Sequence, residues 1–229
     1  MPNHLNNVTE IVNNLYSSFA SAKKQSLFQR DYAGEDGRFG RITEFFQRIT
    51  LAQLAQYATT HCGGGGYIEI GCAEASTSVV LADIAAKNNV SLLCVDPYIW
   101  GVQEASEAMY QEFLTNIKPY PNITHVREMS QSEKGAGAII DFRPSLVFVD
   151  GDHRESYAYA DIAIAYHALP LGGIIVVDDT NFMQKDAGAA FQRAINEGGF
   201  ELVVTPPEIE EALFRSYKSW HIATKRELA

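Results

Sequence analysis

The feature that most restricts the fold of this chain is a regular alternation of short apolar runs with helical segments, which begins at Tyr67. The runs are almost continuously apolar and rich in β-branched residues, and helical periodicity fills the intervals between them. Such runs are typical of parallel strands that crossover helices cover on both faces. The runs are YIEIGC, SLLCVD, NITHVRE, SLVFVD and GIIVVDD, and helices are expected over 76–87, 103–117, 131–140 and 155–169.

Two further strands, FELVV and SWHIATK, are expected after a helix over 184–197. They bring the sheet to seven strands. We therefore predict an α/β fold with a doubly wound, mostly parallel, seven-stranded sheet of the Rossmann-like type.

The N-terminal part is expected to be a helical extension, residues 1–62, ahead of the sheet domain, residues 63–229. A second helix is expected over 42–60, and the glycine-rich, charged segment 28–41 between the helices is expected to be a surface loop or a lid over a cleft. The first helix has one apolar stripe, which is expected to pack on the body of the protein or on a second subunit. Packing on a second subunit would give a homodimer. The stripe consists of Leu5, Val8, Val12, Leu15 and Phe19.

Composition excludes several classes of protein. The 229 residues include 46% hydrophobic and 20% charged residues, which is typical of a globular chain. The 18 basic and 28 acidic residues give a net charge of −10, which disfavours nucleic acid and anionic membrane surfaces as partners. Three cysteines without a CxxC pair predict neither a disulfide framework nor a structural zinc site, and they favour the cytoplasm. No targeting segment or membrane span is expected.

Acidic residues end most of the predicted parallel strands. In open α/β sheets, ligands bind outside the carboxyl ends of the strands, where the connections diverge. Acids at these positions therefore indicate a functional site. The last residues of the five strands are Gly71, Asp96, Glu128, Asp150 and Asp178.

The turn after the first strand is built from small residues, so a ligand can approach its backbone and the following helix N-terminus. It lacks the GxGxxG pattern of dinucleotide dehydrogenases. Asp96 ends the next strand, 25 residues after Gly71, where a carboxylate can bind both hydroxyls of a ribose. The alternatives are a helix-capping role for Glu69 and a turn-starting role for Asp96. The predicted cofactor-binding residues of this part are Glu69, Gly71, Ala73, Ser76, Thr77 and Asp96.

Ser130 and Gln131 follow the third strand and can offer polar groups to an adenine edge. The alternative is a helix cap, in which Ser130 pairs with Glu133 three residues later.

Three aspartates at the ends of two neighbouring strands predict a metal site. Carboxylates that cluster without a counter-ion repel one another, and a divalent cation such as Mg²⁺ removes that penalty. Asp150, Asp178 and Asp179 are the expected ligands, and Asp150 is also expected to border the cofactor. A metal with open positions can bind a hydroxyl and acidify it. His153 would then take the proton, because imidazole titrates near neutral pH, so His153 and Asp150 are the catalytic candidates.

These motifs occur in an order that resembles the class I S-adenosylmethionine-dependent methyltransferases. The resemblance spans about residues 40–229. The motifs that show it are EIGCAEAST, the acid of CVDPY, the MSQ after the third strand and FVDGDH followed by LPLGGIIVVDDT. More narrowly, the aspartates resemble the metal ligands of catechol, caffeoyl-CoA and macrolide-sugar O-methyltransferases. The macrolide-sugar type is similar to this chain in having a histidine at the position of His153, where the catechol type has a lysine. Ala75 stands where many relatives have glycine, and Asp179 where the catechol type has asparagine.

The resemblance implies methyl transfer from S-adenosylmethionine to a hydroxyl of a small molecule, such as a natural-product sugar, a polyketide or a catechol-like phenol. It implies that the metal and His153 deprotonate this hydroxyl opposite the sulfonium. Three alternatives remain at this point: a metal-independent methyltransferase of the same fold, a nucleotide-binding protein of another class, and a non-haem iron oxygenase. The oxygenase would require a second histidine ligand, for which the sequence offers no candidate in the motif.

Overall fold

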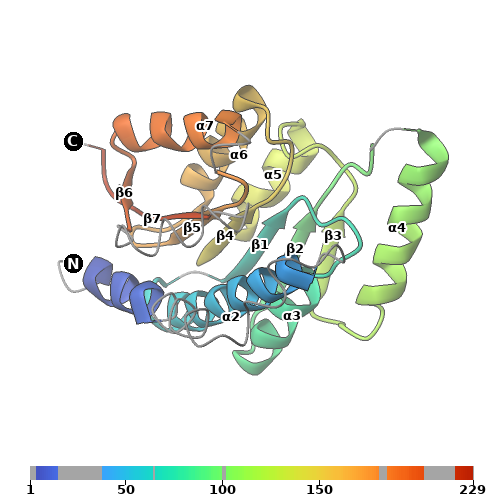
Figure 1. Ribbon diagram of the computed structural model, residues 1–229, viewed down its shortest axis with the longest axis horizontal. Helices are drawn as coiled ribbons and strands as arrows, with labels where there is room; N and C mark the ends of the chain where they lie inside the picture. The colour runs from blue at the N-terminus through green and yellow to red at the C-terminus, as the bar shows by residue number, and fades with distance from the viewer. Residues whose placement is uncertain are drawn as a thin grey trace.

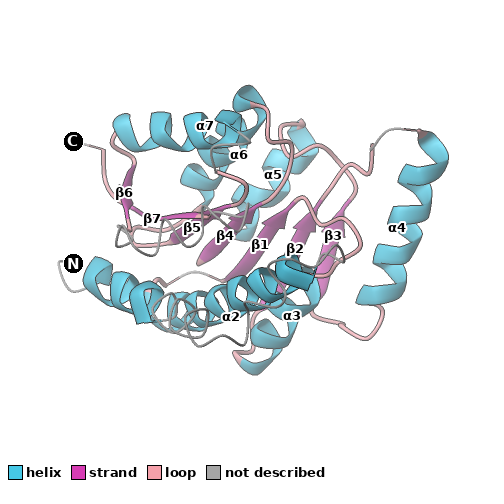
Figure 2. Ribbon diagram, in the orientation of Figure 1, coloured by secondary structure: helices cyan, strands magenta, loops and turns pink. Residues whose placement is uncertain are grey.

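A seven-stranded sheet in the order β3-β2-β1-β4-β5-β7-β6 forms the centre of the protein (Figures 1 and 2). The computed structural model describes residues 4–14, 38–63, 65–99, 102–180, 185–203 and 220–228, with the side chains of the second helix from Arg48 onward. The strands are β1 (Gly66–Ile70), β2 (Ser91–Val95), β3 (Ile123–Val126), β4 (Leu146–Val149), β5 (Ile174–Val177), β6 (Phe200–Leu202) and β7 (His221–Lys225).

The strand pairing confirms the predicted mostly parallel sheet. Strands β1 to β5 pair in parallel, and β7 inserts antiparallel between β5 and β6. The chain moves outward from β1 to β2 and β3 and then returns to place β4 on the other side of β1. The connections after β1 and β4 therefore diverge, which opens a crevice at the carboxyl ends of these two strands.

Helices cover both faces of the sheet, as the apolar strands require. Helices α5, α6 and α7 lie on one face, while α2 and α3 lie on the other (Figure 1). Successive residues of β1 point to opposite faces, so Tyr67 joins the core beneath α2 and α3, and Ile68 joins the core beneath α5, α6 and α7. The helices are α2 (Arg38–His61), α3 (Ser78–Lys87), α4 (Gln103–Ile117), α5 (Glu133–Phe142), α6 (Glu155–Ala168) and α7 (Lys185–Asn196).

The first helix, residues 4–14, packs on the body of the same chain. Val8 and Val12 are buried in the core that α2 and α3 form with the sheet. His4 links the helix to two other elements, because its Nε2 lies 2.7 Å from the Gly172 carbonyl oxygen and its Nδ1 lies 3.0 Å from the Tyr57 hydroxyl. The described part of the apolar stripe is therefore used within the chain, and the homodimer stays a prediction.

Several N-terminal predictions fall on residues that the structure does not describe. Leu15, Phe19 and residues 28–37 of the predicted lid lie outside the described residues, and residues 38–41 form the start of α2. The division into 1–62 and 63–229 stays a prediction as well.

Two details differ from the sequence-based expectation. Strand β3 ends at Val126, so Glu128 lies beyond the strand, where its carboxylate is 3.1 Å from the Lys134 ammonium group. Ser132, and not Ser130, caps α5, because its hydroxyl accepts a hydrogen bond from the Gly135 amide at 3.0 Å. Among the helices that the structure describes, none combines the length and the hydropathy needed to cross a membrane.

Candidate active site

A cleft of about 670 Å³ opens at the carboxyl ends of the central strands, where the connections diverge. It reaches from the end of β3 across β2, β1 and β4 to the end of β5. All predicted site residues except Asp178 line it. They are Glu69, Gly71, Ala73, Ser76, Thr77, Asp96, Ser130, Gln131, Asp150, His153 and Asp179.

The turn after β1 has a left-handed backbone at three positions. Gly71 has a φ of 84°, and a Cβ atom added there would lie 2.0 Å from the carbonyl oxygen of Asp150. Only glycine allows the main chains at the ends of β1 and β4 to approach so closely. Ala73 and Ala75 also have positive φ values, 42° and 75°, which L residues adopt at a cost. The turn at Ala75 therefore has the geometry that glycine would adopt freely.

Asp96 holds this turn in place through its side chain. Its Oδ2 accepts hydrogen bonds from the amides of Cys72 at 2.8 Å and Ala73 at 3.2 Å, and its Oδ1 accepts one from the Tyr98 amide at 2.7 Å. The contact with Tyr98 is the turn-starting role that the sequence offered as an alternative. Asp96 is only 4% exposed, yet its carboxylate borders the cleft. A structural role for Asp96 is thus visible, and the ribose contact stays a prediction.

Glu69 is buried within β1 and is also tied to the protein. The hydroxyl of Ser78, the first residue of α3, donates a hydrogen bond to its Oε2. Burial raises the pKa of the Glu69 carboxyl well above its usual value. Cys72 and Cys94 lie close enough to Glu69 for their ligand atoms to fall within 4.8 Å of one another. Burial also raises the pKa of the Cys72 thiol, which keeps it protonated.

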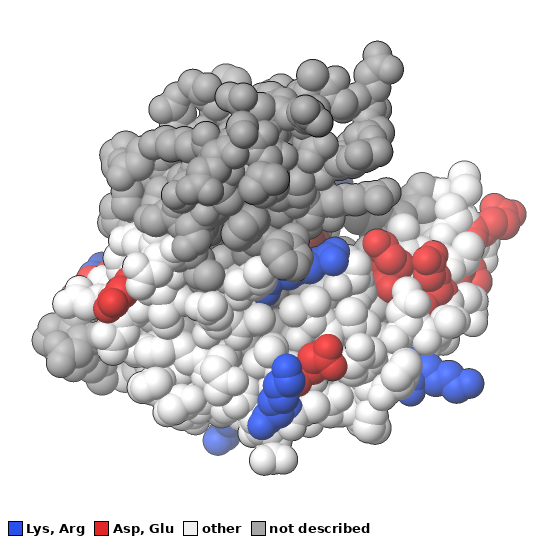
Figure 3. All heavy atoms as spheres, turned by 60° about the horizontal axis from the view of Figure 1, so that its bottom comes forward, with Lys and Arg blue, Asp and Glu red and all other residues white. Residues whose placement is uncertain are grey.

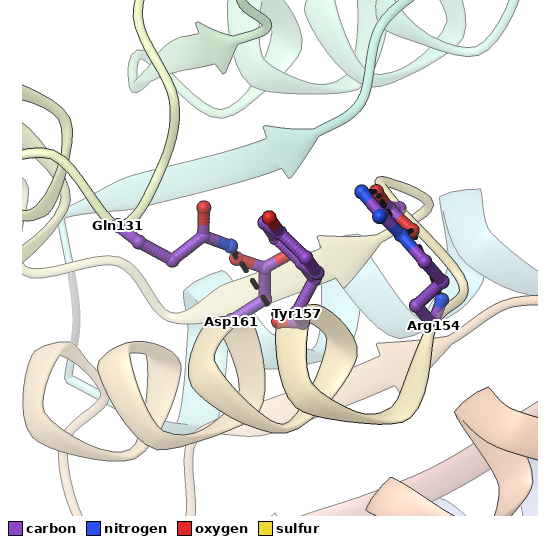
Figure 4. Close-up of polar contacts among 5 residues, drawn as sticks. Gln131, Arg154, Tyr157 and Asp161 are labelled. Carbon is purple, nitrogen blue, oxygen red and sulfur yellow. Dashed lines mark hydrogen bonds and ion pairs between the residues drawn. The ribbon is translucent and has the colours of Figure 1, made fainter.

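Asp161 of α6 is a cleft residue that the sequence analysis missed. Its Oδ1 accepts a hydrogen bond from the Ser130 hydroxyl. The same oxygen accepts a second hydrogen bond, of 2.5 Å, from the Gln131 side-chain nitrogen (Figure 4). Asp161 is 1% exposed, and burial raises its pKa to about 7. The sequence feature that could have indicated Asp161 is a single acid within the buried stripe of α6. The other residues of this stripe are apolar: Ala158, Ile162, Ala165 and Ala168.

An ion pair stands at the edge of the cleft, at the start of α6. The guanidinium group of Arg154 binds both carboxylate oxygens of Asp152 and lies 4.3 Å from the centre of the Tyr157 ring (Figure 4). Hydrogen bonds from Arg154 lower the pKa of the Asp152 carboxyl. Asp152 is therefore paired with an arginine of its own loop.

Asp150, His153 and Asp179 come together at the ends of β4 and β5. Their ligand atoms all lie within 4.8 Å of one another. His153 lies between the two carboxylates, with its Nε2 3.7 Å from an Asp150 oxygen and its Nδ1 3.5 Å from an Asp179 oxygen. The side chains of Asp150 and His153 are 34% and 26% exposed, so solvent and small molecules can reach the group.

Asp178, the third predicted metal ligand, lies outside this group. It is 5% exposed, and its Oδ1 accepts a hydrogen bond of 2.7 Å from the amide of Asp179. Asp179 has a φ of 51°, so the chain turns sharply there and directs the two neighbouring carboxylates differently. The structure thus brings two of the three predicted aspartates together and adds the histidine.

Comparison with known proteins identifies the fold. Residues 68–180 match the model of a methyltransferase domain, and no curated protein sequence matches the chain. Among solved structures, a Staphylococcus aureus protein provisionally assigned as a caffeoyl-CoA O-methyltransferase shares 13% identity and a TM-score of 0.60, over 90% of this chain and 99% of that one. The O-methyltransferase NovP shares 12% identity and a TM-score of 0.56, over 79% and 80% of the two chains.

A third solved structure is CalS11, a TDP-rhamnose 3'-O-methyltransferase of calicheamicin biosynthesis. It shares 12% identity and a TM-score of 0.55, over 92% of this chain and 93% of that one. At such identities the similarity defines the fold, which is that of the class I S-adenosylmethionine-dependent methyltransferases. The match of residues 68–180 to the model of a methyltransferase domain agrees with this fold.

Proposed function

We propose that this protein is an S-adenosylmethionine-dependent and divalent-metal-dependent O-methyltransferase that acts on a hydroxyl group of a small molecule. The observation that supports this function is the meeting of Asp150, His153 and Asp179 at the open end of the cleft, next to the turn after β1. Two carboxylates and an imidazole at this position form a set of groups that can hold a cation and take a proton.

The donor set fits a hard divalent cation such as Mg²⁺. Carboxylate oxygens are the ligands that Mg²⁺ prefers, and the cation would remove the repulsion between Asp150 and Asp179. When bound, the metal lowers the pKa of a hydroxyl that contacts it. Asp178 is retained in the proposal as a third ligand.

The turn after β1 and the end of β2 fit an adenosine-containing cofactor. The left-handed backbone at Gly71 removes side-chain bulk where the cleft passes between β1 and β4. Asp96 would bind the ribose, Ser130 and Gln131 the base, and Glu69, Ala73, Ser76 and Thr77 the part near α3. When bound, S-adenosylmethionine supplies the methyl group on a cationic sulfonium.

His153 is the group in this proposal that removes the proton of the acceptor. Each ring nitrogen of His153 lies beside one carboxylate, Nε2 at 3.7 Å from an Asp150 oxygen and Nδ1 at 3.5 Å from an Asp179 oxygen, which would orient the ring. Asp150 lies at the junction of the two halves of the cleft, because its main chain contacts Gly71 while its side chain faces His153. The chain thereby aligns the acceptor oxygen with the donor end, and such positioning supplies much of the rate enhancement.

The acceptor class in the proposal comes from the family resemblance, and the cleft offers room for such a molecule. We propose a natural-product sugar, a polyketide or a catechol-like phenol, which a cleft of this size admits. The proposal includes neither nucleic acid nor a membrane as a partner, and it places the enzyme in the cytoplasm. Figure 3 shows basic and acidic side chains scattered among uncharged ones on one face of the molecule.

The hydrogen bond between Asp178 and the Asp179 amide favours a second candidate, a metal-independent methyltransferase of the same fold. In that case Asp178 would serve only to hold the turn after β5. The two candidates differ in their response to chelation.

A turnover screen tests both candidates. The purified protein is incubated with S-adenosylmethionine and a panel of sugars, polyketides and catechols, with Mg²⁺ or with EDTA, and S-adenosylhomocysteine release is measured. The proposal expects turnover that EDTA abolishes and Mg²⁺ restores. Turnover that is equal in EDTA would establish the metal-independent candidate instead.

A further inference from the structure

Asp161 controls which groups of Ser130 and Gln131 are available at the cleft. Both side chains direct a donor at the same oxygen, Oδ1 of Asp161. An ionised carboxylate only accepts hydrogen bonds, and a neutral carboxylic acid still keeps one oxygen that only accepts. In the ionised form, and in the neutral form with the proton on Oδ2, Oδ1 of Asp161 accepts the hydrogen bond that the Gln131 amide donates.

This hydrogen bond fixes the orientation of the Gln131 amide. Because the amide nitrogen is held at 2.5 Å from Asp161, the amide oxygen must point away from it, and Figure 4 shows this arrangement. The same nitrogen also lies 3.5 Å from the Tyr157 carbonyl oxygen, a second acceptor on the same side. Gln131 thus offers the cleft an acceptor and withholds its donor.

The position of Gln131 matches the base end of an adenosine-containing cofactor. It follows β3, the outermost strand of the cleft, whereas Asp96 follows β2 and the Asp150 group follows β4 and β5. With about 4.8 Å between neighbouring strands, the span from β3 to β5 is about 19 Å, which suits an extended nucleoside with an amino acid tail.

We propose that Asp161 is a positioning residue that makes the base pocket selective for a 6-amino purine over a 6-oxo purine. The inference rests on the proposed use of S-adenosylmethionine. The amino group of adenine donates hydrogen bonds and can satisfy the Gln131 oxygen, whereas the oxo group of hypoxanthine would place an acceptor against an acceptor. A site built for a donor rejects a ligand that lacks it, because the polar groups of the site are left unpaired.

The test compares two ligands that differ only at this position of the base, S-adenosylhomocysteine and S-inosylhomocysteine, by titration calorimetry. The wild-type protein should bind the adenosine compound more tightly by about tenfold or more. Asp161→Asn provides an amide that can donate to the Gln131 oxygen and let the Gln131 amide rotate. Its preference should fall to within about threefold, chiefly because the inosine compound binds better.

Ser132→Ala is the matched control, because this residue caps α5 in the same loop and lies outside the cleft lining. It should keep the wild-type preference. Asp161→Glu retains a carboxylate and should retain more of the preference than Asp161→Asn. If Asp161→Asn does not fold, Gln131→Leu decides, and a preference that survives the loss of the amide would overturn the inference.

The outcomes separate this inference from the proposed function. If the wild-type protein binds neither compound, the proposed function fails together with the inference. If it binds both equally, or if Asp161→Asn weakens both by the same factor, the cofactor proposal stands and the role of Asp161 is refuted.

Discussion

The two halves of the cleft use their acidic residues in opposite ways. In the half formed by β1 and β2, Glu69 and Asp96 are almost fully buried, and their oxygens accept hydrogen bonds from Ser78 and from three backbone amides. In the half formed by β4 and β5, Asp150 and Asp179 are more exposed, and they face each other across His153.

This contrast shows that acids at strand ends do not all have the same task. Buried carboxylates that accept hydrogen bonds from the protein define the shape of a turn, and they stabilise the fold even without a ligand. Exposed carboxylates that face one another repel, and they gain favourable interactions only when a cation or a proton is present. Substitution therefore distinguishes the two halves by separate measurements of activity and stability.

The largest effect is expected for Asp150→Ala in the β4 and β5 half. We expect metal-dependent turnover to fall by about a thousandfold or more, because a cation ligand and a neighbour of His153 are lost. The affinity for S-adenosylhomocysteine should change by less than about threefold. Turnover and calorimetry measure the two quantities, and an equal loss of both would contradict the division between the halves.

A buried acid outside both pairs, Asp161, should make stability depend on pH. Its pKa is raised from 3.8 to about 7, so the folded protein holds a proton that the unfolded chain releases. Stability from this group is present below about pH 4 and is lost as the pH rises toward 7, by roughly 4 kcal/mol in total. Urea unfolding at several pH values should show this slope in the wild type and a smaller slope in Asp161→Asn. Identical slopes would be inconsistent with a raised pKa.

Asp96→Ala tests the structural role of the β1 and β2 half. Three backbone amides would lose their acceptor, at a cost of about 3 kcal/mol in the free energy of unfolding. Asp150→Ala, measured without metal, should cost less than about 1 kcal/mol, since it removes a repulsion. Chemical denaturation of both variants measures the two losses in the free energy of unfolding. Equal losses would contradict the structural role of the β1 and β2 half.

His153→Ala should lower kcat by about a hundredfold, which is typical for the loss of a general base. The affinity for Mg²⁺ should change by less than about threefold if His153 acts on the acceptor proton. The kcat and the metal affinity are measured on the same preparation. A large loss of metal affinity would instead identify the imidazole as a metal ligand.

Ala75→Gly is expected to have the smallest effect and the opposite sign. Ala75 has a φ of 75°, and glycine would relieve about 1 kcal/mol of strain, but the loss of the fully buried Ala75 methyl group offsets part of this, which leaves a net stabilisation of less than about 1 kcal/mol. Ala82→Gly in the regular helix α3 is the control and should destabilise by a similar amount. Thermal unfolding of the two variants gives the sign of each change in stability. If both variants are destabilised, backbone strain at Ala75 does not contribute as proposed.

The fold could be predicted because the strand composition, the helix periodicity and the residues at the strand ends all indicate the same architecture. The apolar strands and the periodic helices require a sheet covered on both faces, and the acids mark the ligand-binding ends of the strands. The site was predicted less completely for reasons of local geometry. Asp178 and Asp179 are adjacent, and only the contact of 3.5 Å between Asp179 and His153 in the structure shows which carboxylate faces the histidine. Asp161 lies within a helix, and its contact with Ser130 depends on how α6 packs beside the loop after β3.

At Gly71 the cleft narrows to main chain against main chain, because any side chain there would collide with the carbonyl group of Asp150. Under the proposed function, the donor part and the acceptor part of the cleft meet at this junction of two buried strands. An exchange of surface loops for a different acceptor would leave the junction unchanged. The position that would not tolerate such redesign is Gly71 itself.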